Sequence, residues 1–488
     1  MSDHETPETP HTAETSAATG RRSEGRVRRG ARSSRLDLTA VIAVVLVLVA
    51  GVALLLTRPD GWNQPTMAAE QAALRSVTLV CPGALEGKDA VGVATTASGG
   101  GDVDVKGEGA RGDSVPLVDG GVAPVAARKG GVVLTASGRA ASGLVAGRSS
   151  RLPLAATSCT SPSGDQWFTG LGAGPVHNST IELTNPNKGS GVVDITVVDE
   201  KGVVDVPGLR GVAVPGGSSR SIDLQDLMPQ KGSLAIHATV VRGQVAVSVR
   251  DRSAQLVGGS GSEEWLGGQE LPSRSNLLIG YPDGAASRSL TIANPGDSQV
   301  TATVKLLTPD SVLTPAGAPQ VQVAPQTVAT VPLQGLLGKP VAQDAYGVEV
   351  DASGPVTAAL RSIGNGDLAE TVPATPITGT SAVVLPTGVG VRTKTVELAG
   401  SSGVGAATIV SRDATGKELS SKRVALKQQQ GATLDVPAGA AVVEIRPEKV
   451  SVSAAVVLAG RGGAGAAVVP FGELALSARV PSVAPGLR

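Results

Sequence analysis

The stretch STIELTNPNKGSGVVDITVVDEKGVV, Ser179 to Val204, contains the pattern that decides the fold. Apolar and polar residues alternate before and after the pair Asn185-Pro186, and a short turn closes the second run. Alternation with a period of two is typical of strands with one buried face, because successive side chains point to opposite faces. Asn and Pro favour a turn between such strands. The stretch therefore predicts short antiparallel strands.

A second copy of this pattern follows further along the chain. RSLTIANPGDSQVTATVKLLTPDSVL, residues 288–313, has two alternating runs around Asn294-Pro295. SIDLQDL, residues 221–227, matches TVPLQGL, residues 330–336, at the same offset as the two Asn-Pro pairs. Chance rarely preserves one offset over two separate blocks, so the sequence predicts two copies of one module.

Two further copies have weaker signals. Residues 394–419, 432–439 and 450–460 keep the order of the blocks but lack the Asn-Pro pair. VVLTASGRAASGLVAG, residues 132–147, shares an Ala-Ser-Gly with the closing hairpin of the second copy, residues 352–361. We expect a third repeat from the first set of matches. The second match leaves open whether a fourth relative is present.

These patterns predict an all-β protein of tandem antiparallel β-sandwich modules, preceded by one amino-terminal transmembrane helix. Runs rich in Val, Ile, Leu and Thr are broken by Gly, Pro, Asn and Asp at about 8 to 12 residues, as in sandwiches or barrels. Only 1% of the residues are aromatic, so the cores must be aliphatic. We expect the modules to follow one another as a string, with seams in Gly- and Ser-rich stretches such as 256–275.

The predicted order, with the boundaries that the patterns give, is as follows: 1–34, a disordered cytoplasmic tail; 36–57, a transmembrane helix; 75–162, a β module closed by a disulfide; 165–255, 276–366 and 382–476, three β-sandwich repeats; 477–488, a carboxy-terminal tail.

The run LTAVIAVVLVLVAGVALLL, Leu38 to Leu56, has nineteen residues without a charge, enough for a helix to cross a hydrocarbon core of about 30 Å. The arginines that precede it are Arg21, Arg22, Arg26, Arg28, Arg29, Arg32 and Arg35. Only Arg58 follows closely, so the positive-inside rule predicts a single-pass plasma-membrane protein with a cytoplasmic amino terminus and an extracytoplasmic bulk. A cleaved signal peptide is the alternative, but its apolar region is shorter, about 7 to 15 residues.

The chain has two cysteines, Cys81 and Cys159, and both follow the predicted membrane segment. Disulfides persist in extracytoplasmic compartments, so we expect one bridge between them. Two separate buried thiols are the alternative, because a free cysteine is often simply part of a core.

DQWFTG, residues 165–170, places Trp167 beside Phe168 at the start of the first repeat, where the other copies use aliphatic residues. Adjacent strand residues point to opposite faces. We therefore expect one ring to fill the core of its own module and the other to pack against the disulfide-bonded module. The alternative is a ligand platform, since exposed aromatic faces bind sugars.

The sequence offers no constellation for catalysis, and we predict no enzyme activity, no cofactor and no metal site. His4 and His11 lie in the tail, and His177 and His237 have no Cys or acidic neighbours with the spacing of a zinc site. GRGGAG, residues 460–465, fits a phosphate-loop pattern but has no βαβ context. Lys plus Arg equals Asp plus Glu, 42 each, which argues against nucleic-acid binding.

Two classes of function remain. The first is a structural or interaction protein of the cell envelope that supports or docks onto the machinery that builds envelope polymer. The second is an array of glycan-binding β-sandwiches, which so few aromatic residues make harder to build. The sequence identifies neither an envelope protein nor a glycan as the partner.

The cysteine-bounded unit, the WFTG at 167–170, the LTNP at 183–186, the IANP at 292–295 and the amino-terminal anchor together carry a resemblance. With these features the chain resembles a family of unknown function made of β-rich, membrane-anchored extracytoplasmic proteins of actinobacteria. The resemblance implies a location in the cell envelope. It supplies no catalytic residues.

Overall fold

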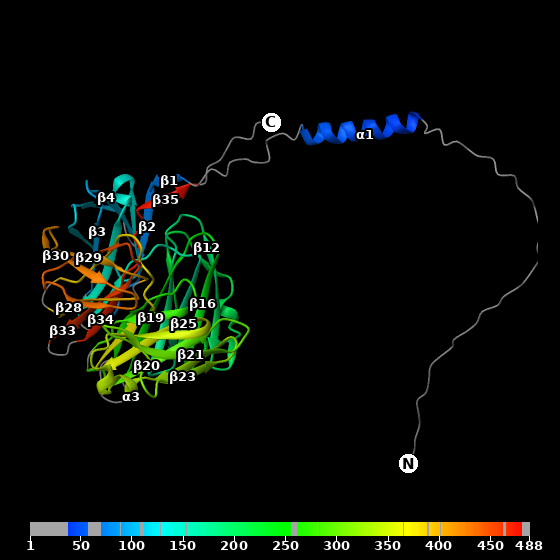
Figure 1. Cartoon of the computed structure of the whole chain (residues 1–488). Helices are drawn as coiled ribbons and strands as arrows, with labels where there is room; N and C mark the ends of the chain where they lie inside the picture. The colour runs from blue at the N-terminus through cyan, green and yellow to red at the C-terminus, as the bar shows by residue number, and fades with distance from the viewer. Residues whose placement is uncertain are drawn as a thin grey trace, which may run out of the picture. The chain divides into compact units, whose positions relative to one another are not determined.

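The computed structural model describes residues 38–56, 70–87, 89–107, 112–126, 128–151, 154–254, 261–282, 284–364, 366–387, 390–400, 402–461 and 465–480. The chain divides into two units, Met1–Ala68 and Ala69–Arg488, and the second contains all the described strands (Figure 1). The predicted tail at 1–34 lies outside the described residues, and so do residues 481–488 of the predicted carboxy-terminal tail.

The first unit contains one helix, α1, Leu38–Leu56. Its bounds are those of the apolar run, and its large apolar side chains are exposed where they are described, over residues 41–54. Among the described residues, no helix is both long enough and apolar enough to span a membrane.

The second unit consists of four β modules, which we call the disulfide unit, repeat 1, repeat 2 and repeat 3. Every strand pair in them is antiparallel. The disulfide unit contains β2 Ser76–Cys81, β3 Asp89–Thr95, β4 Gly101–Gly107, β5 Asp113–Leu117, β6 Val122–Val125, β7 Val132–Ser137, β8 Leu144–Arg151 and β9 Leu154–Ser158, with a 3-10 turn at Gly138–Ala141. These strands form two sheets, β2-β7-β4-β5 and β6-β3-β8-β9.

Repeat 1 contains β10 Asp165–Ala173, β11 His177–Thr184, β12 Gly191–Asp199, β13 Gly202–Val204, β14 Val212–Val214, β15 Ser219–Asp223, β16 Lys231–Arg242, β17 Ala246–Ser253 and β18 Ser262–Leu266, with a 3-10 turn at Pro207–Leu209 and the helical turn α2 Leu224–Leu227. The strands form one path, β13-β12-β16-β10-β11-β17-β18, on which β14 pairs with β12 and β15 with β11.

Repeat 2 contains β19 Ser273–Ile279, β20 Ser287–Asn294, β21 Val300–Leu307, β22 Val312–Leu313, β23 Gln320–Val323, β24 Thr327–Pro332, β25 Gly347–Gly364 and β26 Asp367–Thr371, with helical turns α3 Gln334–Leu337 and Pro340–Ala342. The long strand β25 serves both layers. Its first half pairs with β19 and β21, and its second half pairs with β20 and β26.

Repeat 3 contains β27 Ser381–Val384, β28 Val391–Ala399, β29 Gly405–Arg412, β30 Glu418–Leu426, β31 Ala432–Asp435, β32 Val442–Glu448, β33 Ser453–Gly460 and β34 Ala466–Pro470. Its two sheets are β27-β32-β29-β30 and β31-β28-β33-β34. A last pair of strands, β1 Glu70–Ala73 and β35 Ser477–Val480, joins the two ends of the second unit (Figure 1).

All four modules share one pattern of strand pairing. In the disulfide unit, β2 and β4 flank β7 while β6 and β8 flank β3, and β9 lies beyond β8. In repeat 3, β27 and β29 flank β32 while β31 and β33 flank β28, and β34 lies beyond β33. Repeats 1 and 2 have the same neighbours. The disulfide unit is therefore a fourth copy of the module. The sequence match at residues 132–147 had left this question open.

Repeats 1 and 2 end later than the sequence patterns indicate. Repeat 1 includes β18, past the predicted limit at 255, and repeat 2 includes β26, past the predicted limit at 366. Both closing strands follow a glycine-containing stretch that resembles a linker. Tertiary pairing with the preceding hairpin makes them strands, which local composition does not reveal.

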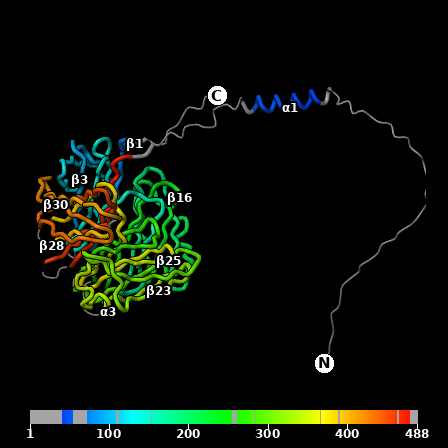
Figure 2. The backbone as a smooth tube through the Cα atoms, viewed as in Figure 1, coloured from blue at the N-terminus to red at the C-terminus, as the bar shows by residue number. Residues whose placement is uncertain are grey.

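The four modules pack into one compact body rather than a string, as the backbone shows (Figure 2). The closing strand of each module contacts the closing strands of two other modules. β9 contacts β18 and β34, and β26 contacts the same two strands. The four closing strands thus surround a common centre, and each module touches two others there.

Each module has its own aliphatic core, as the composition predicts. The core cluster of repeat 1 includes one aromatic side chain, Phe168, and that of repeat 3 includes another, Phe471. Smaller clusters lie where modules meet, for example Ala94 and Val145 of the disulfide unit with Ala382 and Val384 of repeat 3.

Candidate functional site

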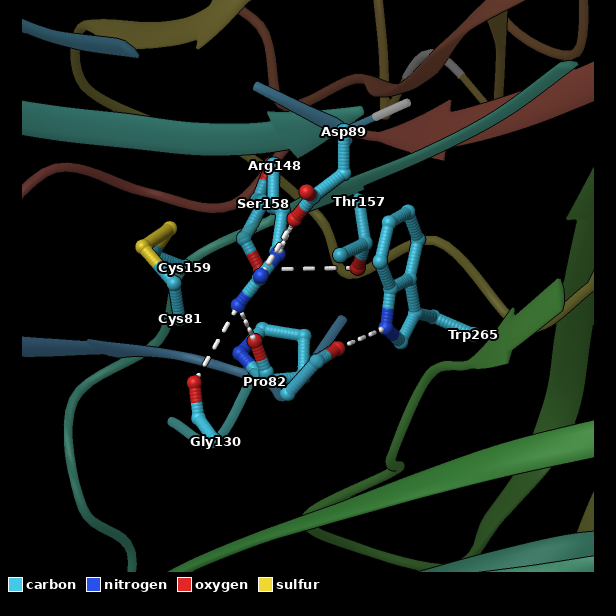
Figure 3. The surroundings of a disulfide bond; sticks show 10 residues. Cys81, Pro82, Asp89, Gly130, Arg148, Thr157, Ser158, Cys159 and Trp265 are labelled. Atoms are coloured by element: carbon cyan, nitrogen blue, oxygen red, sulfur yellow. Dashed lines mark hydrogen bonds and ion pairs between the residues drawn. A yellow bond between two sulfur atoms is a disulfide. The ribbon is translucent and has the colours of Figure 1, made fainter. Parts of the chain in front are cut away.

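Cys81, the last residue of β2, and Cys159, directly after β9, form the predicted disulfide (Figure 3). Both cysteines are buried. Since β2 and β9 belong to different sheets, the bond joins the two layers of the disulfide unit. The 78-residue separation gives a stabilisation of about 4.5 kcal/mol in the chain-entropy model.

Arg148 on β8 is the largest of the fully buried side chains, and it lies beside the disulfide (Figure 3). Its guanidinium donates to the carboxylate of Asp89 and to the carbonyl oxygens of Pro82, Gly130 and Arg128. A buried charge is stable only when it is paired and hydrogen-bonded. Arg148 therefore fixes the chain that leaves Cys81, because one of its acceptors is the next residue.

That chain, residues 82–86, is one of the segments through which the disulfide unit meets repeat 1, and we call it the junction segment. The carbonyl of Gly83 accepts from Trp265 Nε1 at 3.0 Å, and that of Ala84 accepts from Arg250 Nη1 at 3.3 Å. Leu85 packs with Trp265 in a small apolar cluster. The disulfide and Arg148 hold one end of this segment while repeat 1 holds the rest.

Glu182 of β11 completes this junction, because its carboxylate accepts from the Gly83 backbone N–H. The side chain is buried, and this burial raises the pKa of Glu182 above its ordinary value. The Gly83 N–H and the charge of Arg250 partly offset the rise. A carboxylate from repeat 1 is thus buried against the backbone of another module.

The aromatic pair of the sequence prediction has two different roles. Phe168 lies in the core of repeat 1, which also contacts Ala359 of repeat 2. Trp167 stacks on His237 of the neighbouring strand β16, with ring centroids 4.3 Å apart and an angle of 7° between the planes. His237 Nε2 in turn contacts Asp165 Oδ1 at 2.6 Å.

The tryptophan that packs against the disulfide unit is Trp265 of β18, whereas the sequence analysis assigned this contact to Trp167 or Phe168. The difference follows from the closing strands. β18 is the strand of repeat 1 that contacts β9, and a sequence pattern that ends repeat 1 at 255 cannot place it there.

The two Asn-Pro turns are structurally equivalent. Asn185 Nδ2 donates to the carbonyls of Gly189 and Val214, at 2.8 and 3.0 Å. Its Oδ1 accepts from the N–H of Asn187 at 3.0 Å. One buried amide thus ties the turn before β12 to the end of β14. The following residue, Pro186, lies outside the strands.

Asn294 of repeat 2 makes the same bonds, donating to Ser298, Val323 and Ala324 and accepting from the N–H of Gly296. Pro295 follows it, outside the strands. We expect Asn294→Ala to lower the free energy of unfolding by about 2 to 3 kcal/mol, because it leaves several buried backbone groups unpaired.

Chemical denaturation of the full chain in detergent measures this loss. Asp310→Ala, in an exposed turn of the same repeat, is the control and should leave the unfolding midpoint unchanged. An Asn294→Ala protein as stable as the control would show that the amide is dispensable.

Repeats 1 and 2 meet at a buried ion network. Asp251 of β17 is fully buried and accepts from Arg361 of repeat 2 at 3.1 Å. Arg361 also pairs with Glu370 of β26 at 3.2 Å. Burial alone would raise the pKa of Asp251, but His177, Arg361 and Ser179 outweigh it and lower that pKa. Burial and the nearby Asp251 raise the pKa of Glu370.

His177, Ser179 and Asp251 lie together, but not as a catalytic triad. The Ser179 hydroxyl donates to Asp251 Oδ1 and accepts from the N–H of Gly172, and His177 Nε2 contacts the same carboxylate oxygen at 2.9 Å. An activated serine needs a hydrogen bond to its general base, whereas here serine and histidine share the acid. Over the residues that the structure describes, no group of His, Cys, Asp and Glu could hold a metal ion.

Three carboxyl groups gather where β18 meets β26. Burial raises the pKa of Glu264 well above its ordinary value, and the charges of Asp367 and Glu370 raise it further. Burial also raises the pKa of Asp367, which accepts from Ser262 and from the N–H of Ala466. This junction therefore holds protons more tightly in the folded chain than in the unfolded chain.

This retention of protons predicts a pH dependence. Above pH 4.5, the ordinary pKa of a glutamate, Glu264 loses its proton in the unfolded chain but keeps it in the folded chain. The free energy of unfolding therefore falls as the pH rises from 4.5 toward the raised pKa of Glu264 in the folded chain. Glu264→Gln removes this loss. We expect the variant to gain stability over the parent as the pH rises from 5 to 8, measured by denaturant unfolding. A difference that stays constant over this range would contradict the prediction.

A cleft of about 600 Å³ lies between repeat 2 and repeat 3. Both tyrosines of the chain, Tyr281 and Tyr346, line it, together with carboxylates such as Asp344 and Asp435 and the guanidinium of Arg392. The sequence analysis missed this site, because its two walls lie in different modules and no local motif marks them.

The sequence analysis also missed the roles of Trp265 and Arg148 at the junction. For Trp265 a signal exists in the sequence. SEEWL, residues 262–266, places an aromatic and an aliphatic residue side by side within a Gly- and Ser-rich stretch, and aromatic residues are enriched in strands. Arg148 has no such signal, since an arginine in a strand is ordinarily exposed.

A comparison with protein families gives one match. Residues 114–437 match the model of a family of unknown function, DUF5719, so the match runs from within the disulfide unit into repeat 3. No curated protein matches the chain.

Proposed function

This chain belongs to DUF5719, a family of unknown function, and we propose that it is a non-catalytic, membrane-anchored interaction protein of the cell envelope. Its β modules would form one rigid body outside the plasma membrane that supports or docks onto the machinery for envelope polymer. The observation that carries this proposal is the packing of the four modules around their closing strands. Such packing gives a fixed surface, which a docking protein needs and a flexible string of domains lacks.

The buried charged groups support the absence of catalysis, because they are already bound to other groups of the protein. Asp251, Arg148 and Glu182 each contact another protein group across or beside a module junction. Catalytic groups instead converge on a cavity with a free position for a reacting atom. An activity that a single substitution in the modules abolishes would overturn this part of the proposal.

The proposed membrane anchor is the segment Leu38–Leu56, in the predicted range 36–57, inserted with the amino terminus in the cytoplasm. It is supported by nineteen consecutive residues without a charge and by the seven arginines before them. The disulfide between Cys81 and Cys159 also agrees with an oxidising compartment.

A membrane-impermeant maleimide on intact cells tests the topology. With the native cysteines in the disulfide, Gln244→Cys in an exposed turn of repeat 1 should be labelled, and Ser16→Cys should be labelled only after lysis. Equal labelling of both positions in intact cells, or release of the modules into the medium, would contradict the anchored topology.

Photo-crosslinking of the full chain in its native membranes tests docking. Crosslinkers at exposed positions on one face should capture the same envelope protein, and those on other faces should not. Uniform capture from every face, or none from any, would contradict a docking surface.

Glycan binding is the second candidate, and the cleft between repeats 2 and 3 favours it. The sequence argument against this function was the scarcity of aromatic residues. The fold brings the only two tyrosines of the chain to one cleft, from positions 281 and 346.

A further inference from the structure

The floor of the cleft is one face of a sheet in repeat 3. Thr393, Thr395 and Glu397 alternate along β28, so they share that face. Thr433 and Asp435 of β31 share it too, with Asp435 paired opposite Thr395. The floor is therefore a row of hydroxyl and carboxylate groups on two adjacent strands.

The opposite wall comes from repeat 2 and holds the two tyrosines. Tyr281 follows β19, and its hydroxyl donates to the Ala345 carbonyl at 2.7 Å. Tyr346 precedes β25, and its hydroxyl donates to the Leu398 carbonyl at 2.8 Å. These bonds fix both rings in place. Tyr346 is buried, and the guanidinium of Arg288 lies over the Tyr281 ring, so the half-buried Tyr281 supplies most of the aromatic surface that the wall exposes.

The polar side chains of the cleft form a mixed set. Among the described residues, seven of those that are exposed or half-buried make no side-chain hydrogen bond or ion pair: Gln343, Asp344, Arg392, Thr393, Thr395, Thr433 and Asp435. They supply two carboxylates, one guanidinium, one amide and three hydroxyls. Hydrogen-bond donors and acceptors are both present, and the carboxylates outnumber the single guanidinium.

We propose that this cleft binds a short stretch of an uncharged glycan. Each sugar hydroxyl both donates and accepts, so it can pair with carboxylates such as Asp435 and with donors such as Arg392. The apolar faces of sugar rings suit the tyrosine wall. The volume falls within the range of about 300 to 1,000 Å³ for small-molecule sites.

The charges argue against other ligands. An anionic polymer would meet the free carboxylates Asp344 and Asp435 and the buried Asp367 and Glu397, with a single guanidinium, Arg392, to compensate. A wholly apolar ligand would bury seven polar side chains without partners, which is unfavourable. This proposal rests on glycan binding, the second candidate function. If the glycan proposal fails, the proposal of an anchored interaction protein still stands.

Titration calorimetry of the full chain in detergent tests the site. The probes are hexasaccharides of glucose, mannose, galactose and arabinose, with hexagalacturonate as an anionic probe and a glucosamine hexamer as a cationic one. We expect at least one neutral probe to bind, more tightly than either charged probe. The doubly substituted Thr395→Val/Asp435→Ala chain should bind it about tenfold more weakly, because two hydrogen bonds are lost.

The control variant is Asp310→Ala, an exposed acidic position of repeat 2 outside the cleft residues, and it should bind like the parent. The thermal midpoint of the double variant, measured alongside, should match that of the parent, since Asp435 is exposed, Thr395 is half-buried and neither side chain makes a hydrogen bond among the described residues. Failure of every neutral probe to bind up to its solubility limit would overturn the proposal. So would preferential binding of a charged probe, or binding that the double variant leaves unchanged.

Discussion

Trp265→Ala should lower the free energy of unfolding by about 3 to 5 kcal/mol, the range for emptying the site of a buried large aromatic residue. Trp265 is 5% exposed, and it packs on Leu85 and Ala155 of the disulfide unit. The substitution also leaves the Gly83 carbonyl without its indole donor. Because Trp265 connects two modules, the loss should appear in the unfolding of the whole body. Denaturant unfolding of the full chain in detergent measures it.

Trp265→Phe separates the two contributions. It keeps most of the apolar contact and removes only the hydrogen bond, so a smaller loss of about 1 to 2 kcal/mol is expected. Leu271→Ala, at a side chain that is 78% exposed, is the control for loss of apolar bulk in the same stretch and should change little. A Trp265→Ala chain as stable as this control would show that the junction does not depend on the indole.

Arg148→Met should lower the free energy of unfolding by about 3 to 5 kcal/mol, because removing one partner of a buried ion pair leaves the other uncompensated. Methionine replaces much of the side-chain volume but none of the hydrogen bonds. The largely buried carboxyl group of Asp89 would lose its partner, and the carbonyls of Pro82, Arg128 and Gly130 would lose their donor. Thermal and denaturant unfolding should agree on the loss.

Arg151→Met on the same strand is the matched control. Arg151 is exposed and donates only to the Thr387 carbonyl at 3.3 Å, so its loss should cost less than about 1 kcal/mol. Equal losses of unfolding free energy in Arg148→Met and Arg151→Met would mean that the burial of Arg148 has no special role in stability.

The module fold could be predicted because its signals are local. Alternating runs on either side of Asn185 and Asn294 specify strand pairs, and the two asparagines make equivalent hydrogen bonds. The conserved offset between the copies then gives the repeat. Where the Asn-Pro pair is missing, in repeat 3, β28 ends at Ala399 and Gly400 follows with φ +67°, so a glycine makes the turn instead.

The arrangement of the modules could not be predicted in this way. The four closing strands, β9, β18, β26 and β34, meet at the centre through contacts between distant parts of the chain. The pattern of residues within one strand does not indicate which strand of another module will lie beside it. The contact of Trp265 with the disulfide unit was missed for this reason: the place of Trp265 in a Gly- and Ser-rich stretch of the sequence does not determine its neighbour in space. The cleft with Tyr281 and Tyr346 is a product of the same packing.

Scanning calorimetry of the full chain in detergent tests most directly whether the four modules act as one body. One body should unfold in a single transition, with a calorimetric enthalpy equal to the van't Hoff enthalpy, and Trp265→Ala should move the whole transition to lower temperature. Separate transitions for the modules would contradict it, above all if Trp265→Ala shifted only the transition of repeat 1.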